Sequence, residues 1–417
     1  MINNLLQHKI IKNLLSLATV QIINYIVPLL SWPLLANTLG VEQFGVVMML
    51  LAICTIANIL TDFGFNLSAT HTIAQNIQNK QKIAQLLGNI FVIKSMLAII
   101  ACIISSIYIY FKFLINYQTN INIWTLGLVS LIIISQAYNC IWFFHGIEKM
   151  SYITKANVFA KIFYISLLSI LLNLYTHINI ALLCLLISQL WITYLFIWYI
   201  YKEKYFIASP KLDMLWQEVK YSFSFFISRL AVSVYTTANT LILGHFHGAV
   251  SSGLYSSAEK LYAAANGTTG IVSQAVYPYM IKHNNLKLLI QIAIGLEVIL
   301  IVFTYILSLF SENLIVLLFG EDFRAANEYF KVFLIILCLS GISMLFGYPA
   351  FSVVKKVQWA NYTVIVGALL YLVGLIVLFY ANAITAINIV SLVLIIEAIV
   401  LFLRIVMVTL FYLRSKK

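Results

Sequence analysis

Ionisable side chains inside long apolar stretches are the residues of this chain that could do chemistry. They are Lys94, Lys161, Arg229, Glu259, Lys260, Glu297, Glu397 and Arg404, with Asp62 near the end of another such stretch. A charge at membrane depth costs roughly 2.5–3.5 kcal/mol on insertion scales, so these residues usually face a partner or a cavity. The chemistry they offer is the binding of charged groups in lipid surroundings.

Four of the basic residues suit a phosphate group. Arg229 has a planar guanidinium that can hold two phosphate oxygens at once. Lys260 follows Glu259, and neighbouring helix residues point about 100° apart, so one of the two can face a cavity. Lys94 and Lys161 lie about two turns into their stretches. For Arg229, Lys94 and Lys161, the alternative is a side chain that snorkels to the headgroups.

The other ionisable residues suit ion coupling or a structural charge cluster. Glu297 lies in the middle of its stretch and could exchange protons or ions, or pack as a hydrogen-bonded carboxyl group. Glu397 and Arg404 are two turns apart on one helix face, which also fits a structural pair. Asp62 belongs with these candidates.

Two prolines interrupt the first apolar stretch. Pro28 and Pro33 each remove a backbone donor, which predicts a kinked helix and makes them candidate hinge residues.

No motif of an enzyme, a metal site or a cofactor site is present. The sequence lacks G-x-S-x-G, H-E-x-x-H and a Walker A lysine loop, so we expect no catalytic residue and no cofactor. His245 and His247 have no third ligand nearby, so we expect no metal there. The five cysteines lie singly in apolar runs and are interpreted as small apolar residues. The net charge of +12 lies mainly in short loops, which excludes a nucleic-acid face.

The composition identifies the elements that must position these residues. Apolar residues make up 63% of the 417-residue chain and charged residues 9%, with a mean hydropathy of +0.99. Average soluble chains are about a quarter charged. We therefore expect an all-helical polytopic membrane protein. Runs long enough to cross a bilayer lie near 14–36, 44–64, 86–111, 123–144, 156–176, 179–201, 222–244, 254–280, 288–310, 330–350, 361–381 and 387–412.

The loops between these twelve runs indicate the orientation. If the N-terminus is cytoplasmic, seventeen Lys and Arg residues fall on the inside and only Lys112 and Arg324 outside. This asymmetry follows the positive-inside rule and predicts that both termini are cytoplasmic.

The chain divides near its middle. We expect two six-helix lobes, residues 1–201 and 222–417, joined by a cytoplasmic linker at 202–221 whose apolar residues have the spacing of a short interfacial helix. A weak internal echo supports the division: Leu39-Gly40 with Gly45 in the first half, and Leu243-Gly244 with Gly253 in the second.

Several stretches together resemble the Wzx-type O-antigen flippases of the polysaccharide transporter family. They are Gln21–Pro33 with Leu39-Gly40 and Phe44-Gly45, Asp62-Phe-Gly64-Phe-Asn66, Trp142-Phe-Phe-His-Gly146-Ile-Glu148-Lys149-Met150, Tyr235–Asn239, and Gly253-Leu-Tyr255 through Glu259-Lys260 to Tyr277-Pro278. This sequence departs from the family pattern at two positions. His71 stands where Arg is usual, and His145 stands where Gln is usual.

The resemblance implies a fold and a function. It implies membership of the multidrug/oligosaccharidyl-lipid/polysaccharide exporter superfamily, with two lobes around a central cavity that opens to one side at a time. The implied substrate is an undecaprenyl-diphosphate-linked O-antigen repeat unit, flipped across the bacterial inner membrane among membrane lipids. Lys260 lies within the matched stretches and Arg229 lies shortly before one of them, and the resemblance implies for both the role of holding the diphosphate.

Two other functions stay open at this point, a cation-coupled drug exporter of the same superfamily and a membrane O-antigen polymerase. A polymerase and a chain-length regulator are also candidate partners, on which the sequence is silent.

Overall fold

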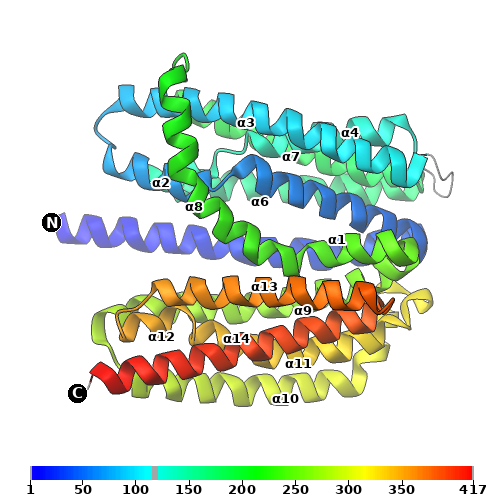
Figure 1. Cartoon of the computed structure of the whole chain (residues 1–417). Coiled ribbons are helices and arrows are strands. Elements are labelled where there is room, and N and C mark those ends of the chain that lie inside the picture. The colour runs from blue at the N-terminus through cyan, green and yellow to red at the C-terminus, as the bar shows by residue number, and fades with distance from the viewer. Residues whose placement is uncertain (1, 115–120, 416–417) are drawn as a thin grey trace. The chain divides into compact units, whose positions relative to one another are not determined.

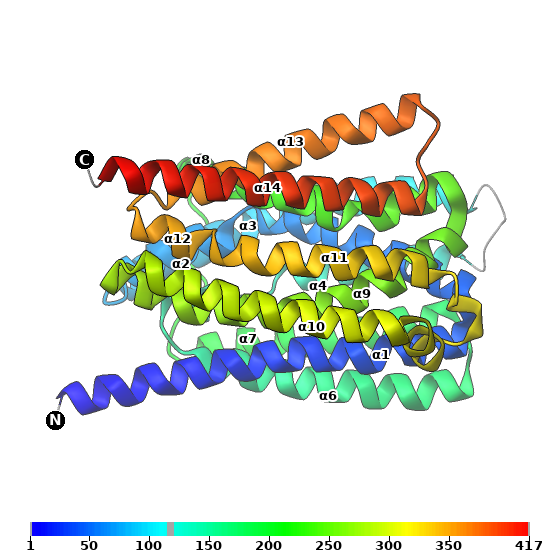
Figure 2. The same cartoon turned by 90° about the horizontal axis from the view of Figure 1, so that it is seen from below.

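The computed structural model describes residues 2–114 and 121–415, which form helices joined by short turns (Figures 1 and 2). The helices are α1 (Ile2–Asp62), α2 (Phe65–Gln75), α3 (Lys80–Ile109), η1 (Tyr110–Leu114), α4 (Ile123–Ala137), α5 (Ile141–Gly146), α6 (Met150–Leu174), α7 (Ile178–Lys202), α8 (Leu212–Thr236), α9 (Ala238–His283), α10 (Leu286–Phe319), η2 (Glu321–Phe323), α11 (Ala326–Leu345), α12 (Tyr348–Val353), α13 (Gln358–Tyr380) and α14 (Ala386–Ser415). The described residues contain no strand, so the predicted all-helical fold is confirmed.

Nine stretches of the described residues are long and apolar enough to cross a membrane. The first, Thr19–Gln75, has 57 residues, more than twice the roughly 20 that one crossing needs. It covers residues 19–36 of the first predicted span and all of the second. The two spans meet at Gly40 (φ 73°, ψ 169°), and Figure 1 shows α1 doubling back. Spans seven and eight meet in the same way at Gly248 (φ 81°, ψ 179°) inside α9. Each of the twelve predicted spans is mainly helical, although the helix is interrupted within residues 123–144, 222–244 and 330–350.

The two turns correct the predicted register of the internal echo. Gly248, not Gly244, has the conformation of Gly40, and both lie in the positive-φ region that favours glycine. Gly45 and Gly253 each follow their turn by five residues. The pairing of Gly40 with Gly244 was wrong by four residues.

The chain before α8 also differs from the prediction of a separate interfacial helix. Residues 203–211 are not helical and lie along α3, where the Ala208 amide donates to the Ala84 carbonyl at 3.1 Å and the Lys211 amide donates to Asn89 Oδ1 at 2.9 Å. The helical spacing seen from residue 212 onward belongs to the first turns of α8, which continue without a break into span seven.

The chain forms two compact units. Unit 1 comprises Met1–Leu39 and Leu50–Leu230, and unit 2 comprises Gly40–Met49 and Ala231–Lys417. In unit 2, α11 packs against α9, α10 and α14. The lobe boundaries and the central cavity expected from the sequence stay predictions.

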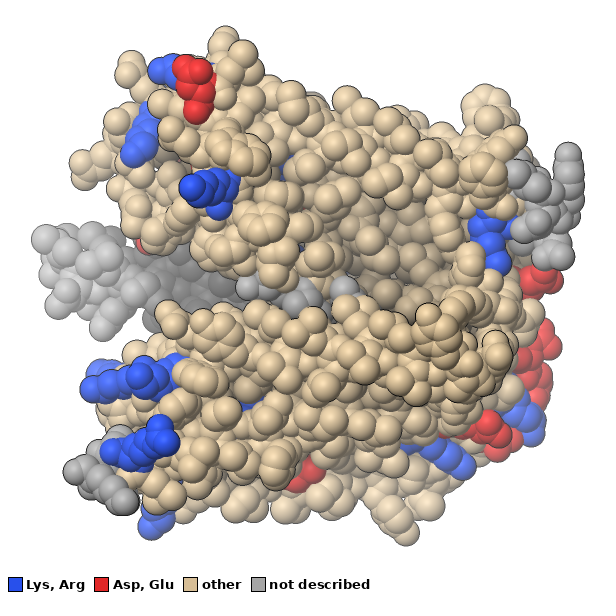
Figure 3. Space-filling view, in the orientation of Figure 1, with Lys and Arg blue, Asp and Glu red and all other residues tan. Residues whose placement is uncertain are grey.

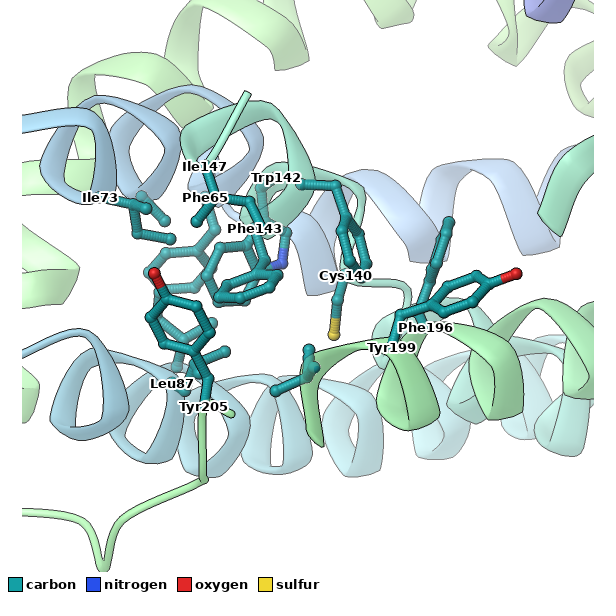
Figure 4. Packing of buried hydrophobic residues seen from close by; sticks show 14 of the residues in the cluster. Phe65, Ile73, Leu87, Cys140, Trp142, Phe143, Ile147, Phe196, Tyr199 and Tyr205 are labelled. Atoms are coloured by element: carbon teal, nitrogen blue, oxygen red, sulfur yellow. The ribbon is translucent and has the colours of Figure 1, made fainter. Parts of the chain in front are cut away.

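Buried aromatic residues surround the helix breaks of unit 1. Figure 4 shows Phe65, Trp142 and Phe143 packed together beside the ends of α2 and α5. All three are fully buried, and the Thr70 hydroxyl of α2 donates to the Trp142 carbonyl at 3.0 Å. The core therefore holds the two interrupted spans of this unit, α1–α2 and α4–α5, in a fixed arrangement.

Charges separate toward opposite ends of unit 2. The end where α10 begins and α12 and α14 finish carries Lys287, Lys355, Lys356 and Arg414. The end where α10 finishes carries Glu312, Glu321, Asp322 and Arg324. Figure 3 shows several basic groups at the left end of the lower half of the view and, at the right end, acidic groups with basic groups among them.

Candidate functional site

The site begins at a break between α1 and α2. Helix α1 ends at Asp62, and Phe63 (φ 45°) and Gly64 (φ 80°) follow in left-handed conformations. A Cβ atom on Gly64 would lie 2.8 Å from the Phe226 amide nitrogen and the Ser222 carbonyl oxygen of α8. Glycine is therefore required here, because the α8 backbone passes directly beside the break.

Two further contacts fix α8 against this break. The Ser68 and Ser222 hydroxyls, both buried, hydrogen-bond at 2.7 Å. The Phe63 and Phe226 rings stack with their centroids 4.6 Å apart. Since Arg229 follows Phe226 by one helical turn, these contacts bring its guanidinium to the end of α1.

Asp62, Lys94 and Arg229 form one cluster, which we call the Asp62 cluster. Arg229 Nη1 donates to Asp62 Oδ2 in an ion pair, and Lys94 Nζ of α3 lies 3.9 Å from Asp62 Oδ1. The Asp62 and Lys94 side chains are only 4% and 3% exposed, whereas that of Arg229 is 41% exposed. Two predicted phosphate ligands thus meet at a residue predicted for ion coupling or structural charge.

By formal charge the Asp62 cluster has one positive charge in excess, since it contains two basic groups and one carboxylate. Asp62 Oδ1 is buried and has no hydrogen-bond partner among the described residues. Its 3.9 Å separation from Lys94 Nζ is too long for a direct hydrogen bond. The cluster is therefore incompletely neutralised, an arrangement suited to an additional anion.

Lys161 lies outside the Asp62 cluster. It is half-buried on α6, three residues before Tyr164, whose hydroxyl hydrogen-bonds to Ser31 of α1. Its predicted contact with the diphosphate stays a prediction.

Lys260 differs from Arg229 in its electrostatic surroundings. Its Nζ lies 3.6 Å from Glu259 Oε2, so the two charges balance locally. Glu259 in turn hydrogen-bonds to the Thr240 hydroxyl. Within unit 2, this lysine offers less net charge to an anion than the Asp62 cluster does in unit 1.

Beside Glu259 lies a buried network that sequence reasoning missed. Asn239 Nδ2 donates to the Tyr255 hydroxyl at 2.9 Å, and the Tyr371 hydroxyl of α13 donates to Asn239 Oδ1. All three side chains are buried. Asn239 and Tyr255 belong to the stretches that carry the family resemblance, which was the available signal.

Arg404 crosses from α14 to the end of α11. Its Nη1 donates to the Ser343 carbonyl at 2.6 Å and to the Ser343 hydroxyl at 2.8 Å, and its Nε donates to the Thr363 hydroxyl at 3.2 Å. Glu397 lies on the same helix and interacts with Arg404 electrostatically. This geometry favours the structural alternative for Arg404.

Glu297 and the two prolines keep their predicted roles as hypotheses. Glu297 Oε2, on α10, is buried with no hydrogen-bond partner in the described part of the chain. Within α1, the only non-helical backbone angles are those of Gly40, so the helix continues through Pro28 and Pro33.

His71, one of the departures from the family pattern, has defined partners. Its Nδ1 lies 2.9 Å from the Tyr221 hydroxyl and its Nε2 lies 3.1 Å from Gln75 Nε2.

Solved structures share this fold. A multidrug resistance MATE family transporter of the MOP superfamily, in an inward-facing conformation, is similar over 93% of this chain and 95% of its own, with a TM-score of 0.73 and 14% identity. The lipid II flippase MurJ, in an inward closed conformation, is similar over 94% and 87%, with a TM-score of 0.72 and 15% identity. At these identities the likeness establishes the fold alone.

Sequence relatives cover a large part of the chain. A protein of Escherichia coli (strain K12) named "Putative O-antigen transporter" is 28% identical over 284 residues, 64% of each chain, so the match spans just under two thirds of that relative. A protein of the same name from Shigella dysenteriae is 27% identical over 272 residues, 65% of this chain and 67% of its own. The profile of the family described as "Polysaccharide biosynthesis protein" matches residues 10–284, which contain the Asp62 cluster and Lys260. The chain belongs to this polysaccharide biosynthesis protein family.

Proposed function

We propose that this protein is a flippase that carries a lipid-linked oligosaccharide, joined through a diphosphate, from the cytoplasmic to the periplasmic leaflet. The observation that carries the proposal is the Asp62 cluster, in which Arg229 and Lys94 share one carboxylate. Its residues lie within the segment matched by the family profile. Relatives named as O-antigen transporters and the shared fold of a lipid II flippase support the same class of substrate.

The chemistry of the substrate explains why such a cluster is needed. A diphosphate cannot enter hydrocarbon unaided, because desolvating its charges costs far more than its lipid tail gains. Arg229 is the most exposed member of the cluster, so it is the group that first meets the headgroup. Lys94 adds a second positive charge behind it.

The proposal also covers the carrier lipid, the orientation of the protein in the membrane and the movement of its two lobes. We take the lipid to be undecaprenyl diphosphate, the membrane to be the bacterial inner membrane and both termini to be cytoplasmic. The separation of basic from acidic groups in unit 2 supports this orientation. Transport would proceed by alternating access of two six-helix lobes, with Pro28 and Pro33 as hinge residues in the first span.

A drug exporter is the rival, since the fold is also that of a multidrug transporter. The excess positive charge of the Asp62 cluster disfavours cationic drugs and therefore favours the anionic substrate. A polymerase would need a reaction centre, for which the sequence provides no motif.

The test is complementation of a strain that lacks the flippase gene. Arg229→Ala should abolish surface polysaccharide and cause the lipid-linked unit to accumulate inside, while Arg229→Lys keeps part of the activity. Arg324→Ala is the matched control, because Arg324 is exposed and pairs with Glu312 and Glu321 at the far end of unit 2. Normal surface polymer with Arg229→Ala, at equal protein levels in the membrane, would refute the proposal. Drug efflux without any effect on polymer would support the rival.

A further inference from the structure

We propose that Asp62 is the residue that releases the headgroup: its carboxylate competes with the substrate diphosphate for Arg229. The proposal rests on the proposed function and adds a role that opposes binding. It predicts that removing this acid makes the protein bind its substrate more tightly and transport it less.

The geometry gives Asp62 the place of a bound anion. Its carboxylate lies between the Arg229 guanidinium and the Lys94 ammonium, as a phosphate oxygen pair would. Both Asp62 and Lys94 are almost fully buried, so neither charge is screened by bulk water. Without the carboxylate, Arg229 and Lys94 would repel each other across the same space.

The carboxylate is also poised to exchange partners. Only Oδ2 accepts a hydrogen bond from Arg229, whereas Oδ1 has no hydrogen-bond partner among the described residues. A fully hydrogen-bonded carboxylate would resist separation from its partners more strongly. A diphosphate that takes Arg229 from Asp62 leaves Lys94 as the remaining partner of the carboxylate, and Asp62 can take Arg229 back.

Counting charges shows why the competition favours release. The Asp62 cluster carries one excess positive charge, and a sugar-linked diphosphate carries two negative charges. The occupied cluster is therefore negative overall, and Asp62 repels the ligand that Arg229 holds. With asparagine in place of Asp62, two cations would face the two negative charges of the diphosphate. The complex would then be neutral, and the ligand would be bound more tightly.

A transporter must both capture its ligand and release it. Binding must be favourable enough to capture the ligand and weak enough to let it leave. In the Asp62 cluster, Arg229 and Lys94 provide capture, and Asp62 limits how long the headgroup stays.

The experiment measures affinity and transport separately on the purified full-length protein. The probe is farnesyl diphosphate linked to glucose, a short-chain compound with the same charged headgroup. Asp62→Asn should lower the Kd for this probe at least about fivefold while reducing surface polysaccharide in cells. Asp62→Glu, which keeps the negative charge, should bind the probe less tightly than Asp62→Asn.

A double variant keeps the test decisive if Asp62→Asn folds poorly. Asp62→Asn with Lys94→Met restores the original excess of one positive charge and leaves no buried lysine unpaired. Its Kd should return toward the wild-type value.

Weaker or unchanged binding in a folded Asp62→Asn protein would overturn the release role. The same would follow if the double variant bound as tightly as Asp62→Asn. Failure of the flippase proposal itself would look different, because Arg229→Ala would then leave binding of the probe intact.

Discussion

Gly45 and Gly253 pack backbone against backbone in unit 2. A Cβ atom on Gly45 would lie 2.9 Å from the Gly253 amide nitrogen, and one on Gly253 would lie 2.5 Å from the Val41 carbonyl oxygen. Each glycine follows its turn, at Gly40 or Gly248, by five residues. The starts of spans two and eight are therefore equivalent segments that cross at their two glycines.

This crossing predicts that an added methyl group destabilises unit 2. Gly253→Ala should cost about 1–3 kcal/mol, because the contact is with backbone that cannot move aside. Thermal unfolding of the detergent-solubilised protein, followed by loss of the monodisperse peak, measures the effect. Gly295→Ala is the control, since a Cβ at Gly295 meets nothing within 4 Å. Equal midpoints for the two variants would contradict the close crossing.

The sequence predicted the spans well, because a bilayer-length apolar run has few structures open to it. It did not predict where spans break. The run at 123–144 reads as one helix, yet α4 ends at Ala137 and α5 begins at Ile141. The break lies beside Trp142 and its neighbours in the buried core, and hydropathy does not predict such packing.

For the site, too, the sequence identified the important residues but not which of them interact. Burial cost alone marked Asp62, Lys94 and Arg229 as significant. Their association joins residues 167 positions apart, and nothing in a single sequence pairs them. Lys260 looked equivalent to Arg229 by sequence, and only the structure shows that Glu259 balances its charge.

Glu203, at the end of α7, predicts a pH dependence of stability. Burial alone would raise the pKa of this carboxyl group, but hydrogen bonds from Lys149 and Tyr152 lower it overall. A depressed pKa gives stability that is fully present above the unfolded value of about 4.5 and is lost as the pH falls through the folded value.

Glu203→Gln should therefore lower the unfolding midpoint at neutral pH and flatten its decline in acid. The measurement is the midpoint as a function of pH, from neutral to below about 4.5. Glu328→Gln, at an exposed position, should follow the wild-type curve. Parallel curves for Glu203→Gln and wild type would show that the ion pair with Lys149 adds no stability.

Arg404 predicts a structural effect without a direct effect on the substrate. Arg404→Met removes the donors to the Ser343 carbonyl and to the Thr363 hydroxyl, which keeps its own hydrogen bond to the Ala360 carbonyl. Each such loss costs about 1–3 kcal/mol, so the unfolding midpoint should fall clearly. Arg414→Met, at the exposed end of α14, should change it little. Loss of transport by Arg404→Met at unchanged stability would instead assign Arg404 to substrate binding.

The Tyr255–Asn239–Tyr371 network predicts a cooperative stabilisation of unit 2. Tyr371→Phe removes the donor to Asn239 Oδ1, and Tyr255→Phe removes the acceptor for Asn239 Nδ2. Either change removes one hydrogen bond of a buried amide, at a cost of about 0.5–1.5 kcal/mol. Because both tyrosines hold the same amide, the two losses should not add in the double variant, which a double-mutant cycle of unfolding measures. Tyr380→Phe, at a position 80% exposed, is the control. Additive losses would mean that the two hydrogen bonds act independently, and Asn239 would then be an ordinary packed residue rather than the centre of a network that holds α13 against α9.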